Sequence, residues 1–97
     1  MITGKQRASL RALAHGLTPV VIIGKDGLTD GVIDSIRDSL YARELIKIRL
    51  LNTCDLSTRD ISNQVCNLLS AEPVQCIGSI IVLYKKSNKP NIEHIEF

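Results

Sequence analysis

The sequence predicts an α/β (α+β) fold: a two-layer sandwich in which three helices lie mainly on one side of a four-stranded mixed sheet. Apolar residues recur at helical spacing in three segments and at strand spacing, or in short runs, in four others, in the order α-β-α-β-α-β-β. Two β-α-β units predict parallel neighbouring strands joined by right-handed crossovers. A hairpin at the end of the chain adds antiparallel pairing.

The composition describes one small globular domain. The chain has 97 residues, of which 44% are hydrophobic and 23% charged. A chain of this size can bury a stable core without disulfide bonds or metal ions. We expect a single, monomeric domain over residues 1–97, with its core at about residues 3–86 and a C-terminal tail at residues 87–97. The formal net charge is only +2, so a nucleic-acid surface must come from local clustering of cations.

The cysteines and the length of the apolar runs indicate in which cell compartment the protein is expected and whether it binds a metal or cofactor. Cys54, Cys66 and Cys76 are an odd number without a C-x-x-C pair. No apolar run is long enough to cross a bilayer, and the first residues carry no signal-peptide core. We therefore expect a cytoplasmic protein without membrane contact, metal or other cofactor.

The first helix begins at Thr3, which forms a capping box with Gln6. Arg7 and Arg11, one turn apart, share one side of this helix. Pro19 follows its end, where His15 either complements the helix dipole or contacts an anion. The side expected to be buried carries four apolar residues: Leu10, Leu13, Ala14 and Leu17.

A short buried strand at residues 20–23 runs into the turn Gly24-Lys25-Asp26-Gly27, followed by Leu28 and by Thr29, which caps the second helix. Glycine at both ends of the turn lets the backbone adopt positive φ and approach a ligand closely. The helix start offers unpaired N–H groups and the positive end of its dipole. Lys25 adds a mobile charge. This arrangement favours a phosphate group, and the alternative is a glycine turn that only reverses the chain.

The second helix and the next strand each have one apolar side. The helix buries Val32, Ile33, Ile36 and Leu40, and an acidic ridge on its opposite side faces solvent. The segment 44–51 alternates, with Lys47 and Arg49 on the side opposite Ile46, Ile48 and Leu50. Two cations at its centre predict a sheet face that is at least partly open.

The last third of the chain predicts a helix and a hairpin. Ser57 caps the third helix, whose buried stripe is Ile61, Val65, Leu68 and Leu69. Residues 74–77 and 80–84 then flank Gly78-Ser79, a two-residue hairpin turn with glycine first. We expect the basic segment 85–90 to be a solvated tail, the alternative being an extra phosphate contact.

Three classes of function compete. Catalysis is disfavoured because no nucleophile elbow, H-x-x-E or comparable signature is present. A small nucleotide-binding domain is disfavoured because the glycine turn matches neither the dinucleotide nor the P-loop pattern. A protein-interaction module, with Leu45 and Leu51 beside Lys47 as a partner surface, stays open. Only three aromatic residues occur, which argues against binding that depends on stacking bases over aromatic platforms.

The chain resembles the YhbY family, the stand-alone bacterial form of the CRM domain. The segments that carry the resemblance run from about residue 6 to residue 86, in the family's order and at compatible spacing. They are Leu13-Ala14-His15, Pro19 to Gly24, Gly27-Leu28-Thr29 with Val32, Glu44 to Lys47, Ile77-Gly78, and Val82-Leu83-Tyr84.

The resemblance implies an RNA-binding domain with a four-stranded mixed sheet and three helices, associated with precursors of the large ribosomal subunit. Its G-x-x-G loop, here Gly24 to Gly27, is compared with that of KH domains, where the turn packs on the nucleic-acid backbone. We therefore expect contact with structured ribosomal RNA and no small-molecule substrate. The expected RNA-binding residues are Gly24, Lys25, Asp26, Gly27, Leu28, Thr29, Arg7, Arg11, Lys47 and Arg49.

Overall fold

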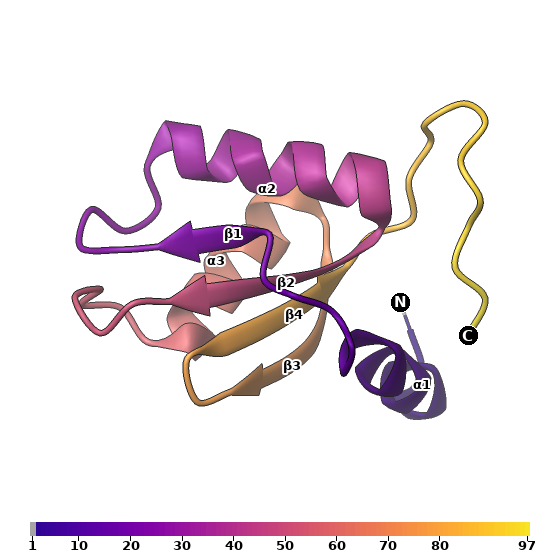
Figure 1. Ribbon diagram of the computed structural model, residues 1–97, viewed down its shortest axis with the longest axis horizontal. Helices are drawn as coiled ribbons and strands as arrows, with labels where there is room; N and C mark the ends of the chain where they lie inside the picture. The colour runs from indigo at the N-terminus through magenta and orange to yellow at the C-terminus, as the bar shows by residue number, and fades with distance from the viewer. Residues whose placement is uncertain (1) are drawn as a thin grey trace.

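The computed structural model describes residues 2–97, so residue 1, where we expect the domain to begin, lies outside it. Helices and strands follow one another in the predicted order (Figure 1). They are α1 (Gly4–Ala14), β1 (Val21–Ile23), α2 (Asp30–Arg43), β2 (Leu45–Leu50), α3 (Thr58–Leu69), β3 (Glu72–Ile77) and β4 (Ile80–Tyr84).

The four strands form one mixed sheet in the order β1-β2-β4-β3. β1 and β2 are parallel neighbours, whereas β4 lies antiparallel between β2 and β3. The prediction of parallel neighbours is therefore confirmed for the first β-α-β unit and wrong for the second. β4 is buried along most of its length, whereas β3 is largely exposed. The central position, which is covered on both sides by neighbouring strands, therefore suits the more apolar β4.

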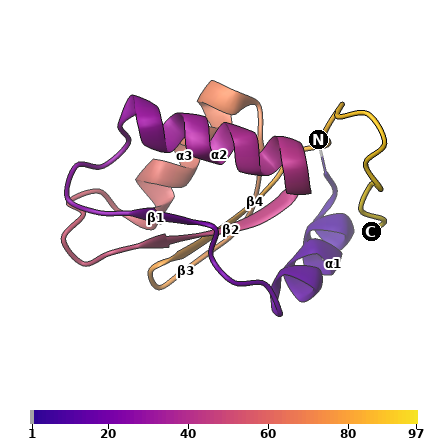
Figure 2. The same ribbon diagram turned by 45° about the horizontal axis from the view of Figure 1, so that its top comes forward.

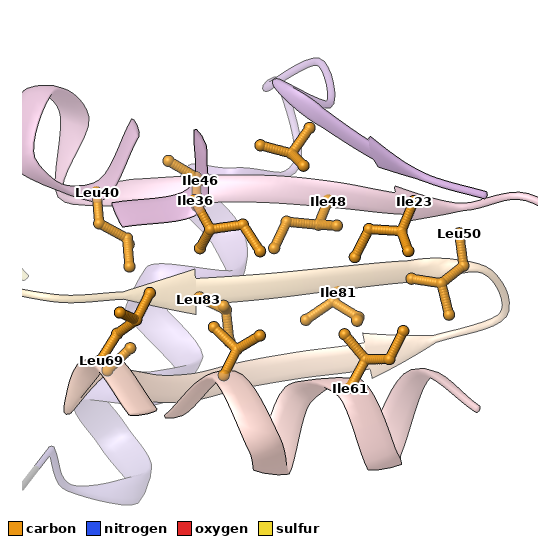
Figure 3. Packing of buried hydrophobic residues seen from close by; sticks show 13 residues of the cluster. Ile23, Ile36, Leu40, Ile46, Ile48, Leu50, Ile61, Leu69, Ile81 and Leu83 are labelled. Carbon is orange, nitrogen blue, oxygen red and sulfur yellow. The ribbon is translucent and has the colours of Figure 1, made fainter. Parts of the chain in front are cut away.

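The two longer helices cover one face of the sheet. α2 packs on β1 and β2, and α3 packs on β3 and β4 (Figures 1 and 2). Figure 3 shows the layer between these helices and the sheet, where side chains of β2 and β4 such as Ile48 and Ile81 point toward the helices. This layer is the main core.

α1 lies on the opposite face of the sheet, at the end where β2 begins (Figure 2). Leu10 and Ala14 of α1 pack against Leu45 and Val82 in a second apolar cluster. The prediction that Leu13 and Leu17 are also buried is wrong, because they are 49% and 39% exposed. The helix ends at Ala14, before Leu17, and crosses only one end of the sheet, so a single side of it is covered.

The predicted helix starts are confirmed. The side chains of Thr3, Thr29 and Ser57 accept hydrogen bonds from the amides of Gln6, Val32 and Asp60, respectively. These bonds satisfy N–H groups that a helix leaves unpaired in its first turn. Leu68, expected in the buried stripe of α3, is instead 61% exposed.

The edge strands differ most from the prediction. β1 starts at Val21, and Ile22 is 57% exposed, so this strand is half-buried and not fully buried. β3 starts earlier than expected, at Glu72, and takes in Pro73 with a bulge before Gln75. A proline is tolerated here because β3 is an edge strand, where the missing N–H costs no ladder bond.

The segment after β4 is held against the domain, so the prediction of a solvated tail is wrong for part of it. Ser87 is buried, and Ile95 and Phe97 pack against the second apolar cluster. The anchor is Glu44, which is fully buried and whose carboxylate accepts hydrogen bonds from the amides of Ser87 (2.7 Å) and Ile95 (2.9 Å). Nδ1 of His94 lies 2.6 Å from the same carboxylate.

Glu44 combines burial with an unusual backbone conformation. Its φ is +65°, a region that residues other than glycine seldom adopt. Burial alone would raise the pKa of this carboxyl group, but the hydrogen bonds from Ser87, Ile95 and His94 outweigh burial and lower the pKa. The charged form is therefore the one that the fold stabilises.

Candidate nucleic-acid interface

The glycine turn is built as an exposed loop between β1 and α2. The amide of Gly27 donates to the carbonyl oxygen of Gly24 (3.1 Å), and the amide of Thr29 donates to the carbonyl oxygen of Gly27 (3.1 Å). Gly27 has a φ of +66°, which favours glycine. Gly24 has no positive φ, so the expectation that both glycines adopt this conformation is wrong for Gly24.

The loop between β2 and α3 supports the turn. A side chain at Gly24 would meet Leu51 at 3.6 Å, and one at Gly27 would meet Leu56 at 3.9 Å. The amide of Leu51 donates to the carbonyl oxygen of Ile23 (2.8 Å), which fixes the distance between the two loops. Together with the β3–β4 hairpin they form what we call the turn end of the sheet (Figure 1).

The charges of the turn itself do not favour an anion. The segment 24–30 carries one lysine and two aspartates, Lys25, Asp26 and Asp30, so its formal charge is −1. All three side chains are exposed. An anion at this site must therefore be held by backbone N–H groups and the helix dipole, with cations from neighbouring elements.

Arg49 and Lys47 lie on the face of the sheet that α2 and α3 leave uncovered, as the alternation predicts. The register places Ile22, Arg49 and Ile80 side by side on β1, β2 and β4. Arg49 lines a hollow with Ser57 and Ser79 at the turn end. Lys47 lies two residues further from the turn, in an apolar hollow lined by Leu13 of α1 and by Leu17, which follows this helix.

Arg7 and Arg11 lie away from the turn. α1 packs at the opposite end of the sheet, which we call the tail end because residues 85–97 also lie there (Figure 1). Nε of Arg7 donates to the carbonyl oxygen of Pro73 in β3 (3.0 Å), so this arginine has a structural partner. The structure places the turn and Arg49 at the same end of the sheet, places Lys47 nearer α1, and leaves the two α1 arginines apart.

The structure also places Leu45 and Leu51, which were expected to form a partner surface together, at different ends of the sheet. Leu45 is buried under α1, whereas Leu51 is 40% exposed at the turn end. The most exposed apolar residues of the sheet are instead Ile22 (57%) and Ile77 (60%). Residues 20–23 are all apolar, so no alternation in the sequence marks Ile22 as outward-facing, although successive side chains of a strand point to opposite faces.

The described part of the chain contains neither a metal-binding cluster nor a membrane-spanning helix. Residues 2–97 contain no group of three or more histidine, cysteine, aspartate or glutamate side chains that could hold a metal ion. None of the helices described here is long and apolar enough to cross a membrane. The three cysteines are free.

Comparison with known proteins gives a consistent set of relatives. The family model of the CRS1 / YhbY (CRM) domain matches residues 2–85. A Bacillus subtilis (strain 168) protein named Probable RNA-binding protein YqeI is 43% identical over 89 residues, covering 92% of this chain and 93% of that protein. A Haemophilus influenzae (strain ATCC 51907 / DSM 11121 / KW20 / Rd) protein named RNA-binding protein is 38% identical over 92 residues, covering 95% and 93% of the two chains.

The fold also matches a solved structure. The solution structure of the hypothetical protein SAV1595 from Staphylococcus aureus superimposes with a TM-score of 0.69. The two chains are 40% identical, and the match covers 94% of this chain and 95% of that one.

Proposed function

This chain belongs to the CRS1 / YhbY (CRM) domain family, and we propose that it is a single-domain RNA-binding protein without catalytic activity. Its ligand is structured RNA of the large ribosomal subunit or its precursors, and it acts during assembly of that subunit in the cytoplasm. Relatives that match nearly the whole chain are named RNA-binding proteins, which supports the ligand class. The resemblance to the YhbY family supports the ribosomal assignment.

The geometry of the Gly24–Thr29 turn carries the proposal. The turn projects from the sheet, is fixed by two internal hydrogen bonds, and leads directly into the first turn of α2. The side chain of Thr29 accepts a hydrogen bond from the amide of Val32. The amides that precede Val32 at the start of the helix have no partner within the helix. A phosphate oxygen placed here accepts hydrogen bonds from these N–H groups and lies at the positive end of the helix dipole.

The neighbouring cations extend this contact along the uncovered face of the sheet. Lys25 lies in the turn, Arg49 at the turn end and Lys47 nearer α1, so one RNA strand crossing the face meets all three. Arg7 and Arg11 are reached only by an RNA that also passes α1. Each phosphate contact contributes a slope of about −0.7 to −0.9 to the dependence of log affinity on log salt.

The test is binding of native protein and Lys25→Glu to folded fragments of large-subunit ribosomal RNA at several salt concentrations. The expected result is weaker binding by the variant and a salt dependence shallower by about one contact. Lys5→Glu is the matched control, because Lys5 is exposed on α1 at the tail end and carries the same charge change.

The proposal fails if the native protein binds no RNA above background. Equal losses from Lys25→Glu and Lys5→Glu would also contradict it, since this result would mean that only net charge matters and not the turn.

A second candidate, a module that docks on assembly intermediates through protein, is favoured by one observation. Ile22 and Ile77 are more than half exposed and flank Arg49 and Ile80 in one row across the sheet. Apolar residues in such a row are typical of a protein-binding face. In this case Ile22→Ser would reduce binding to ribosomal precursor particles, while Lys25→Glu would leave it unchanged.

A further inference from the structure

A second concave site lies at the tail end, far from the glycine turn. A cavity of about 360 Å³ opens between α2, the C-terminal end of α3 and the segment that follows β4. Its floor is apolar, formed by Leu40 and Leu69, and Tyr41 forms part of its wall. The volume is within the range of about 300–1,000 Å³ found for small-ligand sites.

The lining of this cavity is cationic. Arg37, Lys85 and Lys86 line it, and no aspartate or glutamate of residues 2–97 does. Lys89, also exposed, follows in the same segment. The contrast with the glycine turn is clear, since that turn carries a formal charge of −1. An anionic ligand is therefore favoured more strongly by side-chain charge at the cavity than at the turn.

The ion pair between Arg37 and Asp34 does not close the site. Arg37 pairs with Asp34 one turn earlier in α2 (2.6 Å), and both side chains are more than half exposed. An exposed pair of this kind contributes little and is readily exchanged for a phosphate. Asp38, also exposed on α2, is the other carboxylate of this helix near the site.

Tyr41 gives the cavity a flat aromatic surface. Its side chain is 45% exposed. Tyr84 is buried, and Phe97 packs edge-on against it with ring centroids 4.9 Å apart. Among the described residues, Tyr41 is therefore the aromatic that is free to stack on a ligand.

The cavity wall is held in place. The hydroxyl of Ser87 donates to the carbonyl oxygen of Tyr41, and the amide of Ser87 donates to the buried carboxylate of Glu44 (2.7 Å). These bonds fix the segment that carries Lys85 and Lys86 against α2. The backbone that carries Tyr41, Lys85 and Lys86 is thus held in place before any ligand binds, which reduces the entropy cost of binding.

We propose that this cavity takes a single unpaired nucleotide of RNA. The base stacks on Tyr41 over the apolar floor, and its phosphates lie against Lys85, Lys86 and Arg37. A duplex would reach the cations but leave the floor uncovered, because its bases are already stacked and paired. The proposal depends on the proposed function for its ligand class, RNA, but places a separate contact at the opposite end of the domain.

The experiment is an amide chemical-shift titration of the full chain with an oligouridylate of about six nucleotides, which forms no duplex. The expected shifts cluster at residues 37–41 and 85–88. Tyr41→Ala weakens this binding by about 5-fold to 150-fold, the loss of one base stack, whereas Tyr41→Phe retains it. Leu68→Ala, at a site 61% exposed on α3, is the matched control for truncation.

The outcomes separate this inference from the proposed function. The proposal of a nucleotide site in the cavity would be overturned by chemical shifts confined to the turn end. It would also be overturned if Tyr41→Ala bound the oligomer as well as the native chain does. The cations of the cavity would then only complement the C-terminal ends of the helices. A parallel titration with folded ribosomal RNA and Lys25→Glu tests the turn by itself. Loss of oligomer binding in Tyr41→Ala supports the cavity whatever Lys25→Glu does.

Discussion

Gly24 and Gly27 close one turn through a single hydrogen bond of 3.1 Å, yet their backbones differ. Gly27 has a φ of +66°, whereas Gly24 has no positive φ. A side chain at Gly24 would make an ordinary contact with Leu51 at 3.6 Å. The backbone conformation of the turn therefore favours glycine at position 27 but not at position 24.

Alanine substitution tests this difference. Gly27→Ala forces a side chain into the left-handed region and is expected to lower the free energy of unfolding by about 1–2 kcal/mol. Gly24→Ala is expected to leave stability within about 0.5 kcal/mol and to weaken RNA binding, because the added methyl group blocks close approach to the backbone. Urea unfolding and RNA binding measure the two effects. Undiminished RNA binding by a folded Gly24→Ala variant would show that nothing approaches this glycine closely.

Arg7 and Arg11 form a matched pair for separating structure from binding. Arg7 donates to the carbonyl oxygen of Pro73, 66 residues away, whereas Arg11 is exposed in the last turn of α1. Arg7→Met is expected to lower the free energy of unfolding by about 0.5–1.5 kcal/mol. Arg11→Met should change it by less than about 0.5 kcal/mol. If the two substitutions prove equally mild in thermal melts, the bond to β3 contributes nothing.

Glu44 links stability to pH. Because hydrogen bonding lowers its pKa in the folded chain, its contribution is complete above its ordinary pKa near 4.5 and is lost as the pH falls through the lower, folded value. Glu44→Gln removes an acceptor and is expected to cost about 1–3 kcal/mol at neutral pH. The difference between native and variant chains should shrink below about pH 4.5. A difference that stays constant down to acid pH would exclude the charged network as the cause.

The cysteines differ in expected reactivity. Burial raises the pKa of the Cys66 thiol, an effect that a hydrogen bond from Ser62 only partly offsets. Cys76 is exposed. Iodoacetamide at neutral pH should therefore modify Cys76 well before Cys66, because the thiolate is the reactive form. Peptide mass spectrometry gives the rates, and the urea-unfolded chain, in which the two rates should converge, is the control.

Local chemistry was enough to predict much of the fold. The helix starts at Thr3, Thr29 and Ser57 depend on hydrogen bonds within three residues, which a sequence pattern states directly. The two faces of β2 follow from strict alternation. The Gly78-Ser79 hairpin follows from the residue types that its turn requires.

Features that depend on distant partners could not be predicted. The carboxylate of Glu44 is satisfied by residues 43 to 51 positions later, and nothing near Glu44 marks it as buried. Leu13 is exposed because of where α1 crosses the sheet, which periodicity within α1 does not specify. The cavity beside Tyr41 is assembled from α2, α3 and the segment after β4, so its residues are not neighbours in the sequence. The turn was recognisable, but its neighbourhood was not.

The central place of β4 has a consequence for how this chain matures during synthesis. The strand made last occupies the gap between β2 and β3, so both of these carry an unpaired edge until residues 80–84 have left the ribosome. A nascent or truncated chain that ends before Ile80 would present the unpaired edges of β2 and β3 to other molecules, the usual template for aggregation. Completion of the sheet, and then docking of the segment held by Glu44, must therefore follow the emergence of residues 80–84.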